Sequence, residues 1–339
     1  MEYKEILDSA RTCIGPYCKA CPVCNGKACG NQVPGPGAKA PGSGFIRNFD
    51  AWQKICVNMD TICPNEPVDT AVDLFGTMYR YPFFAAPLGA MKLHYGEKYT
   101  DREYNSILVN ACADSGIAAF TGDGVDAAVF QGAMEAIRTA GGVGVPTIKP
   151  WNQELVFEKL DLARTSGCKA VAMDIDGAGL PFLKNLTPPA GSKSVSELAE
   201  IAQQAGVPFI VKGIMTAKAA LKAQQAGAHA IIVSNHGGRV LDQCAATAEV
   251  LPEIAAAVGG KMRIIVDGGV RSGVDIFKAL ALGADAVVIA RPFVTAVFGG
   301  GKEGVKVYIE KLAAELKDTM AMCGAFTLKE ITSEMVRRS

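Results

Sequence analysis

A histidine and an arginine three positions apart are the residues of this sequence best suited to chemistry. His236 and Arg239 stand in the run SNHGGR at 234–239, with two glycines between them that let the backbone turn. A neutral imidazole accepts a proton, and a guanidinium binds a carboxylate through two parallel hydrogen bonds. The pair therefore predicts a site that takes a proton from a substrate carrying a carboxylate. The alternative is a histidine that caps the core beside a solvated arginine.

Two later segments predict a site for a phosphate group. The runs DGGVR at 267–271 and ARP at 290–292 each carry an arginine. Glycines let backbone N–H groups approach an anion, and a helix that begins near residue 272 would add its dipole. A tight turn with two solvated arginines is the alternative interpretation. Alone, these segments predict only a ligand that carries phosphate.

Five of the eleven cysteines lie within residues 13–29. The central C-x2-C-x2-C spacing resembles part of an iron–sulfur motif, although the C-x4-C that follows is not the usual ferredoxin ending. Four thiolates suit structural zinc equally well, and free thiols are the third interpretation. The candidate metal ligands are Cys18, Cys21, Cys24 and Cys29.

The charge balance argues against two classes of partner. The 339 residues include 34 basic and 34 acidic side chains, so the formal net charge is zero. Proteins that bind nucleic acids or membrane surfaces carry a basic footprint, so we expect neither partner. No apolar run reaches the roughly 18 residues that a membrane span needs. We therefore expect a cytoplasmic protein with reduced cysteines and no membrane span.

From about residue 83 onward, short apolar or β-branched runs alternate with helical stretches. This alternation predicts a parallel sheet, and eight successive strand–helix units predict a closed (β/α)8 TIM barrel. Active sites of such barrels lie at the C-terminal ends of the strands, where the three segments described above fall. The predicted strands span 83–87, 117–121, 144–148, 170–174, 208–212, 230–234, 263–267 and 286–290.

Capping residues predict where several outer helices begin. Thr216 precedes a helical pattern at 216–226, and Ser272 precedes another at 272–282. A final amphipathic stretch at 303–322 is the predicted last outer helix.

The N-terminal part of the chain differs from the rest. Residues 1–45 hold the cysteine cluster and a Pro/Gly-rich run at 33–44 that suits neither helix nor strand. We expect a Cys-rich N-terminal segment at 1–45, followed by the barrel at 46–339. Segment 30–45 could fold over the mouth of the barrel and bring the cysteines close to its ligand.

Four motifs together resemble the FMN-dependent 2-hydroxy-acid dehydrogenase/oxidase family, which includes glycolate and lactate oxidases. They are VKGI at 211–214, SNHGGRVLD at 234–242, LPEI at 251–254 and the long run at 267–292. The resemblance implies bound FMN and the oxidation of a small 2-hydroxy acid, similar to L-lactate or glycolate, to the 2-oxo acid. It also implies an electron acceptor, either oxygen or a partner protein, and a homotetramer or octamer.

The resemblance also implies roles for individual residues. His236 would be the base, taking the hydroxyl proton while hydride passes to flavin N5, or else taking the Cα proton first, and Asp176 would orient it. Arg239 would hold the substrate carboxylate, and Lys212 would lie at the N1/O2 edge of the flavin. FMN contacts are implied for Ala86, Pro87, Leu88, Gly89, Thr121, Lys149, Lys212, Ser234, Asp267, Gly268, Gly269, Arg271, Ala290 and Arg291.

Several positions depart from the family pattern. Lys149 and Trp151 stand where the family has Gln and Tyr, and Asp174 replaces a Thr. The run at 177–184 lacks the second carboxylate-binding Arg, and Tyr17 cannot be aligned with the family's N-terminal Tyr. We expect Trp151 to contact substrate, and Lys149 to lie against the flavin pyrimidine or to restore the missing positive charge. We also expect Asp174 to pair with Lys149.

These departures leave two alternative functions open. One is an FMN-dependent barrel enzyme of another type, either an isomerase or an oxidoreductase acting on a substrate other than a hydroxy acid. The other is a non-catalytic barrel that binds a phosphate ligand or supports an assembly.

Overall fold

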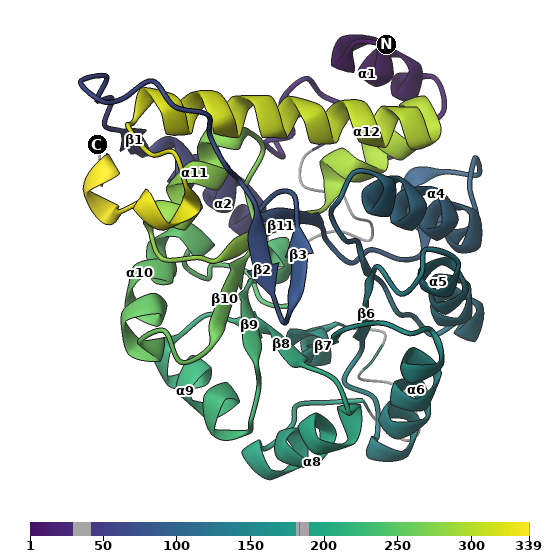
Figure 1. The fold of residues 1–339 in the computed structure, drawn as a ribbon. Coiled ribbons are helices and arrows are strands. Elements are labelled where there is room, and N and C mark those ends of the chain that lie inside the picture. Colours follow the sequence, from purple (N-terminus) through teal and green to yellow (C-terminus); the bar gives the residue numbers. More distant parts are fainter. Residues whose placement is uncertain (30–41, 181–182, 184–189, 339) are drawn as a thin grey trace.

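Eight parallel strands form a closed barrel at the centre of the molecule (Figure 1). The computed structural model describes residues 1–29, 42–180, 183 and 190–338. The strands are hydrogen-bonded in the order β4-β11-β10-β9-β8-β7-β6-β5, and a parallel bridge between Ala85 and Ala119 closes the ring. The strand bounds are β4 (Phe83–Ala85), β5 (Phe120–Thr121), β6 (Val145–Ile148), β7 (Val171–Asp174), β8 (Phe209–Ile214), β9 (Ala230–Val233), β10 (Arg263–Val266) and β11 (Ala286–Ile289).

The predicted barrel is confirmed, and each predicted strand corresponds to one observed strand. Central strands such as β7, β9 and β11 are buried along their whole length, which explains their continuous apolar runs. The observed strands are mostly shorter than predicted. The strand expected at 117–121 is regular only at its end, although Ala119 bridges to Ala85.

Helices surround the barrel and cover its outer face (Figure 1). The cap residues Thr216 and Ser272 accept hydrogen bonds from the backbone of Ala219 and Asp275, as their sequence positions predicted. The bounds are α1 (Tyr3–Arg11), α2 (Ser43–Gln53), α3 (Met91–Tyr95), α4 (Asp101–Asp114), α5 (Ala127–Thr139), α6 (Gln153–Thr165), α8 (Val195–Ala205), α9 (Ala217–Gln225), α10 (Thr247–Val258), α11 (Gly273–Ala281) and α12 (Arg291–Met322).

The predicted last helix at 303–322 corresponds to the part of α12 that follows a kink at Gly301, where φ is 56° and ψ is −140°. The part before the kink begins at Arg291, directly after β11, and was not predicted. Gly299 has a packing role. A β-carbon there would lie 2.0 Å from the Ile6 carbonyl oxygen, so glycine lets α1 approach α12 closely.

Two small two-stranded sheets lie outside the barrel. The hairpin of β2 (Val72–Leu74) and β3 (Thr77–Tyr79) lies in front of the barrel strands in Figure 1. β1 (Ile55–Val57) pairs with the C-terminal β12 (Val336–Arg338) in an antiparallel manner.

The expected boundary at residue 46 falls inside α2, which begins at Ser43. Residues 30–41 lie outside the described part of the chain, and with them most of the segment expected to fold over the barrel mouth. Within the described residues, no helix combines the length and the apolar character needed to cross a membrane.

Candidate active site

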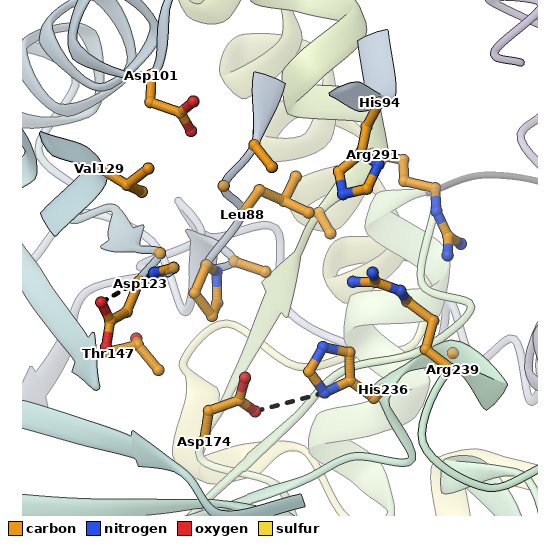
Figure 2. A pocket seen from close by; sticks show the side chains of 18 of the residues that line it. Leu88, His94, Asp101, Asp123, Val129, Thr147, Asp174, His236, Arg239 and Arg291 are labelled. Atoms are coloured by element: carbon orange, nitrogen blue, oxygen red, sulfur yellow. Dashed lines mark hydrogen bonds and ion pairs between the residues drawn. The ribbon is translucent and has the colours of Figure 1, made fainter. Parts of the chain in front are cut away.

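A cavity of about 850 Å³ opens at the C-terminal ends of the barrel strands (Figure 2). Its wall is built from the segments that follow the strands, which is the expected location for a barrel active site. All of the residues predicted to contact FMN line this cavity except Thr121 and Ser234. The predicted catalytic residues His236, Arg239 and Lys212 line it too.

His236 follows β9 in a tight, glycine-rich loop. Its φ of 54° lies in the left-handed region, which side-chain-bearing residues rarely adopt. The Asn235 side chain accepts a hydrogen bond from Gly237 N (3.0 Å), and Ser234 Oγ accepts one from His236 N (3.2 Å). These local bonds hold the imidazole in one orientation at the end of the strand.

Helix α2 fixes this loop from outside the barrel. Asn48 Nδ2 donates to Asn235 Oδ1 (2.7 Å), and Asn235 Nδ2 donates back to Asn48 Oδ1 (2.9 Å). The Asp242 carboxylate accepts from the backbone N–H groups of Gly42 and Gly44 at the start of α2, at 3.0 and 2.9 Å. Asn48 was not predicted from the sequence, because nothing in its local pattern marks it.

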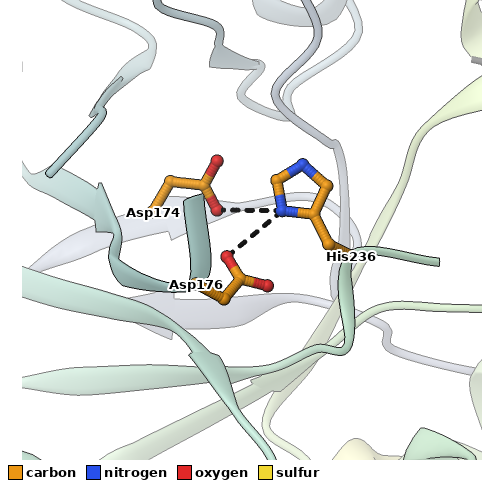
Figure 3. Close-up of side chains that lie close together, drawn as sticks. All are labelled: Asp174, Asp176 and His236. Carbon is orange, nitrogen blue, oxygen red and sulfur yellow. Dashed lines mark hydrogen bonds and ion pairs between the residues drawn. The ribbon is translucent and has the colours of Figure 1, made fainter. Parts of the chain in front are cut away.

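Two carboxylates face the same nitrogen of His236 (Figure 3). The distance from His236 Nδ1 to Asp176 Oδ1 is 3.2 Å, and that to Asp174 Oδ1 is 3.5 Å. Asp176 therefore lies where the resemblance placed it, beside the imidazole. Asp174 provides a second carboxylate at a position where the family carries a Thr.

The register of β7 and β8 places Asp174 next to a lysine. Asp174 and Lys212 are direct partners in the parallel ladder, and Lys212 Nζ lies 3.0 Å from Asp174 Oδ1. Lys149 also forms an ion pair with Asp174, which confirms the predicted pairing. Lys212 lies 3.9 Å from both Asp176 and Asp267, so it is the central cation among three carboxylates.

A glycine immediately after Lys212 makes room for Asp176. Gly213 has a φ of 105°, and the β8–β9 register shifts between Lys212 and Ile214. A β-carbon on Gly213 would lie 2.5 Å from the Asp176 β-carbon. Glycine is therefore required here for the carboxylate to reach His236.

The charges in this group shift the pKa values of the base and its neighbours. Burial, together with the charges of Lys212, Lys149 and Arg239, holds the pKa of His236 well below its ordinary value despite the opposing effect of Asp174. The imidazole is thus neutral near pH 7, the form that a general base needs. Burial and the nearby Asp174 raise the pKa of Asp176 well above its usual range, although Lys212 opposes this.

Asp174 and Lys212 remain charged despite their burial. Burial alone would raise the pKa of Asp174, but its contact with His236 and the positive charges of Lys149 and Lys212 outweigh burial and keep this pKa well below its usual range. Burial would likewise lower the pKa of Lys212, yet the surrounding carboxylates raise it above the ordinary lysine value. A permanent positive charge therefore lies at the wall of the cavity.

The structure corrects the predicted role of Trp151. Its indole Nε1 donates to Asp123 Oδ2 (2.6 Å), and it is absent from the residues that line the cavity. Asp123 also accepts from Lys149 N (3.0 Å) and Lys159 Nζ (2.8 Å). Trp151 thus helps to anchor the segment after β6, and Lys149 alone reaches the cavity from it. Asp123 was not predicted from the sequence.

Buried polar atoms without partners surround the cavity. They include the Nε atoms of Arg239 and Arg291, the hydroxyls of Thr121 and Thr147, and Asp267 Oδ1. Unpaired buried polar groups are costly, so this set indicates a polar ligand that satisfies them. Two of them belong to arginines, which suits a ligand that carries anionic groups.

The segment after β10 has a shape that suits the predicted phosphate cradle. Gly268 and Gly269 have φ values of 87° and 88°, and a β-carbon on Gly269 would lie 2.3 Å from the Asn48 carbonyl oxygen. The cradle therefore leaves no room for a side chain and exposes backbone to the cavity. Together with Arg271 and Arg291, these glycines fit the phosphate end of FMN.

The cavity wall also contains a histidine that was not predicted from the sequence. His94 is buried, lines the cavity, and its Nδ1 has no hydrogen-bond partner. Burial and the charge of Arg239 lower its pKa to about 4, so it is a neutral group near the substrate-binding arginine. Histidine is rare in this chain, which has three, and this rarity was a signal that could have identified His94.

The predicted metal ligands lie together beside the active site. Cys18, Cys21, Cys24 and Cys29 are partly buried, form no disulfide, and line a second cavity of about 300 Å³.

Known proteins match the chain over nearly its full length. A family model described as FMN-dependent dehydrogenase matches residues 36–185 and 182–338. A peroxisomal (S)-2-hydroxyacid oxidase of Arabidopsis thaliana is 31% identical over 327 residues, covering 86% of this chain and 87% of that protein. The 4-hydroxymandelate oxidase of Amycolatopsis orientalis is 30% identical over 332 residues, covering 84% and 88%.

Solved structures agree with these sequence matches. Mandelate oxidase with (S)-2-phenylpropionate has the same fold, with a TM-score of 0.81 at 24% identity over 99% of this chain and 97% of that chain. A mandelate oxidase variant with an FMN adduct has a TM-score of 0.76 at 26% identity, covering 92% and 98%. The barrel, the polar cavity and these matches together show that the chain belongs to the FMN-dependent 2-hydroxyacid dehydrogenase/oxidase family.

Proposed function

We propose that this protein oxidises a small 2-hydroxy acid to the corresponding 2-oxo acid, with His236 as the base. The observation that carries this proposal is the neutral imidazole of His236, held between the carboxylates of Asp174 and Asp176 and next to Arg239. Bound FMN would supply the acceptor for the two electrons that leave the substrate carbon. The protein's own residues bind the acid, orient it and move its proton.

His236 accepts the proton at Nε2. Its Nδ1 faces the two carboxylates, which favours a hydrogen on Nδ1 and leaves the lone pair of Nε2 free. As the substrate hydroxyl loses its proton, the ring becomes positively charged. The Asp174 carboxylate, which stays charged, then stabilises that charge at 3.5 Å, and Asp176 orients the ring through its 3.2 Å contact with Nδ1.

Arg239 holds the substrate carboxylate. It leaves the same loop as His236, its Nε has no partner within the protein, and its guanidinium lies in the cavity (Figure 2). A carboxylate bound there places the neighbouring hydroxyl-bearing carbon close to the imidazole. Lys149 does not replace the missing second arginine as a free cation, because Asp174 already binds it.

Lys212, Lys149 and the phosphate cradle would hold FMN. Lys212 carries its charge at the cavity wall, where it would stabilise a flavin that has gained electrons. Arg271, Arg291 and the glycines at 268–269 would hold the phosphate. Heat release of the ligand and chromatography should therefore give FMN, whereas FAD or the absence of flavin would contradict this assignment.

A substrate panel tests the reaction itself. Anaerobic protein is mixed with glycolate, L-lactate, D-lactate or L-mandelate, and the flavin absorbance is followed. At least one L-2-hydroxy acid or glycolate should bleach the flavin and yield the 2-oxo acid. Arg239→Lys keeps the positive charge but loses the fork geometry, so it should weaken binding of that same acid. No bleaching by any of them, in protein that holds FMN, would contradict the proposal.

One observation supports a second candidate function. The buried ion pair of Lys149 and Asp174 stands where the family has uncharged side chains, so the surroundings of the flavin differ from those of a simple hydroxy-acid oxidase. An FMN-dependent isomerase, or an oxidoreductase for another substrate, would use this difference. It predicts bound FMN that the hydroxy acids of the panel leave oxidised.

A further inference from the structure

We propose that Cys18, Cys21, Cys24 and Cys29 bind an iron–sulfur cluster that carries electrons from the flavin site to a partner protein. The electron-transfer part rests on the proposed function, because substrate must first reduce FMN. The presence of the cluster does not depend on it. The site lies in the segment before the barrel and is separate from the groups that act on substrate.

The four cysteines surround a cavity of their own. The loop that carries them contains no regular helix or strand, and the four residues line a space of about 300 Å³. The fifth cysteine of the region does not belong to this set. Cys13 Sγ donates to the carbonyl oxygen of Phe298 (3.3 Å) and lies 3.5 Å from Lys98 Nζ. The structure thus selects the four cysteines with C-x2-C-x2-C-x4-C spacing.

The cysteine sulfurs are not gathered as a single zinc ion requires. Within the described ranges, only Asp174, Asp176 and His236 form a group of three ligand atoms within 4.8 Å of one another. A tetrahedral zinc ion needs its thiolates about that close or closer. A four-iron cluster needs a central space, because each of its thiolates binds a different iron. The four cysteines line such a space, of about 300 Å³.

A single layer of side chains separates this cavity from the flavin pocket. Phe45, Arg271 and Arg291 line both spaces. Arg291 stacks on the Phe45 ring at 3.7 Å, and Arg271 Nε donates to the carbonyl oxygen of Cys24 (2.8 Å). The cysteine loop packs tightly on this layer, because a β-carbon on Gly26 would lie 2.2 Å from the Phe45 ring. A cluster here would therefore be adjacent to bound FMN.

The surrounding charges suit thiolate ligands. Arg271 and Arg291 lie on the cavity wall and offset the negative charge of the thiolates.

The outer side of the loop is accessible to a partner. Pro22 and Val23, between the cysteines, are exposed, and so are Lys19 and Lys27. This small apolar surface flanked by lysines fits an acidic electron-carrier protein. Oxidation of a 2-hydroxy acid releases two electrons and two protons. The cluster would pass the electrons singly to two molecules of the one-electron carrier, and the protons would go to water.

Metal analysis of anaerobically purified full-length protein tests the site. We expect about four irons and four sulfides per chain, and an electron paramagnetic resonance signal after dithionite reduction. A variant with C18S, C21S and C24S together should lose both, while Cys13→Ser should keep them. Equimolar zinc without sulfide would overturn the cluster, and metal-free wild-type protein would overturn any metal site.

Electron transfer is tested with oxidised rubredoxin, a small acidic one-electron protein. Enzyme reduced by substrate should reduce rubredoxin, and the triple variant should do so at least about tenfold more slowly. FMN content and flavin reduction by substrate should be unchanged in that variant, which also shows that it has folded. Equal rubredoxin reduction by both proteins would overturn the relay. If substrate fails to reduce wild-type FMN, the proposed function fails, whereas the iron and sulfide contents still decide the cluster.

Discussion

Asn48 of α2 and Asn235 of the His236 loop exchange two side-chain hydrogen bonds, of 2.7 and 2.9 Å. Both amides are buried, and Asn48 Oδ1 also accepts from Thr247 N (3.2 Å). The amide pair joins the helix before the barrel to the loop that holds the base. It explains how His236 keeps a left-handed backbone conformation beside flexible glycines.

Asn48→Ala should slow catalysis without emptying the flavin site. The substitution removes two of the hydrogen bonds of the buried Asn235 amide, which keeps those with Gly237 N and Ala245 O, at a cost of about 1–3 kcal/mol in the free energy of unfolding. Because the loop loosens, we expect a lower rate of flavin reduction at saturating substrate. Asn110→Ala, which removes a bond within α4 only, is the control. Lower stability with an unchanged reduction rate would limit Asn48 to a structural role.

Gly269→Ala should abolish FMN retention. A β-carbon at this position would lie 2.3 Å from the Asn48 carbonyl oxygen, so the phosphate cradle must shift. Gly227 offers a matched control because its φ is also positive, at 81°, but nothing lies within 4 Å of its added β-carbon. FMN content after gel filtration compares the two variants. Equal flavin loss would show that backbone strain, and not the close approach, is responsible.

The two ion pairs of Asp174 predict that Asp174→Asn loses more stability than Lys149→Gln. Asp174→Asn removes the carboxylate partner of Lys149 and the nearest carboxylate of Lys212, and breaking a buried pair costs about 3–5 kcal/mol. Lys149→Gln leaves Asp174 with Lys212, so we expect a clearly smaller loss. Urea unfolding measures both. A larger loss for Lys149→Gln would show that Lys149, and not Lys212, is the main partner of Asp174.

The lowered pKa of His236 predicts activity in mildly acidic solution. A base is lost as pH falls through its pKa, so a pKa below the ordinary 6.5 extends activity below that pH. The flavin reduction rate should stay constant from about pH 8 to about pH 6. His229 lies outside the cavity, so His229→Gln should show the same profile. If the flavin reduction rate fell to half at a pH near or above 6.5, this result would contradict the environment described for His236.

The barrel and most of its site could be predicted because the strands are visible in the sequence and the site lies at their C-terminal ends. The eight apolar runs specify the parallel strands, and the residues that follow each run must meet at one end of the barrel. His236, Arg239, Lys212 and the cradle at 267–271 were found in this way. The pairing of Lys149 with Asp174 was predictable because both follow strands and carry opposite charges.

Other features depend on contacts that no local pattern contains. Asn48 and Phe45 reach the site from α2, far from the barrel strands in sequence. Trp151 was assigned to substrate by alignment, but its N–H is bonded to Asp123, a residue without any sequence signal. The first part of α12 was not predicted because it is buried from Pro292 to Gly299, so its sequence lacks the amphipathic pattern of 303–322.

Anaerobic stopped-flow measurement of flavin reduction in wild-type protein and His236→Ala tests the central claim most directly. The variant should retain FMN and its unfolding temperature, since His236 lies in the cavity and not in the core. We predict that the substrate that bleaches wild-type flavin will reduce the variant about 10²–10⁴-fold more slowly, the usual scale of general base catalysis. An equal rate of flavin reduction in the two proteins would remove His236 from the reaction and contradict the account.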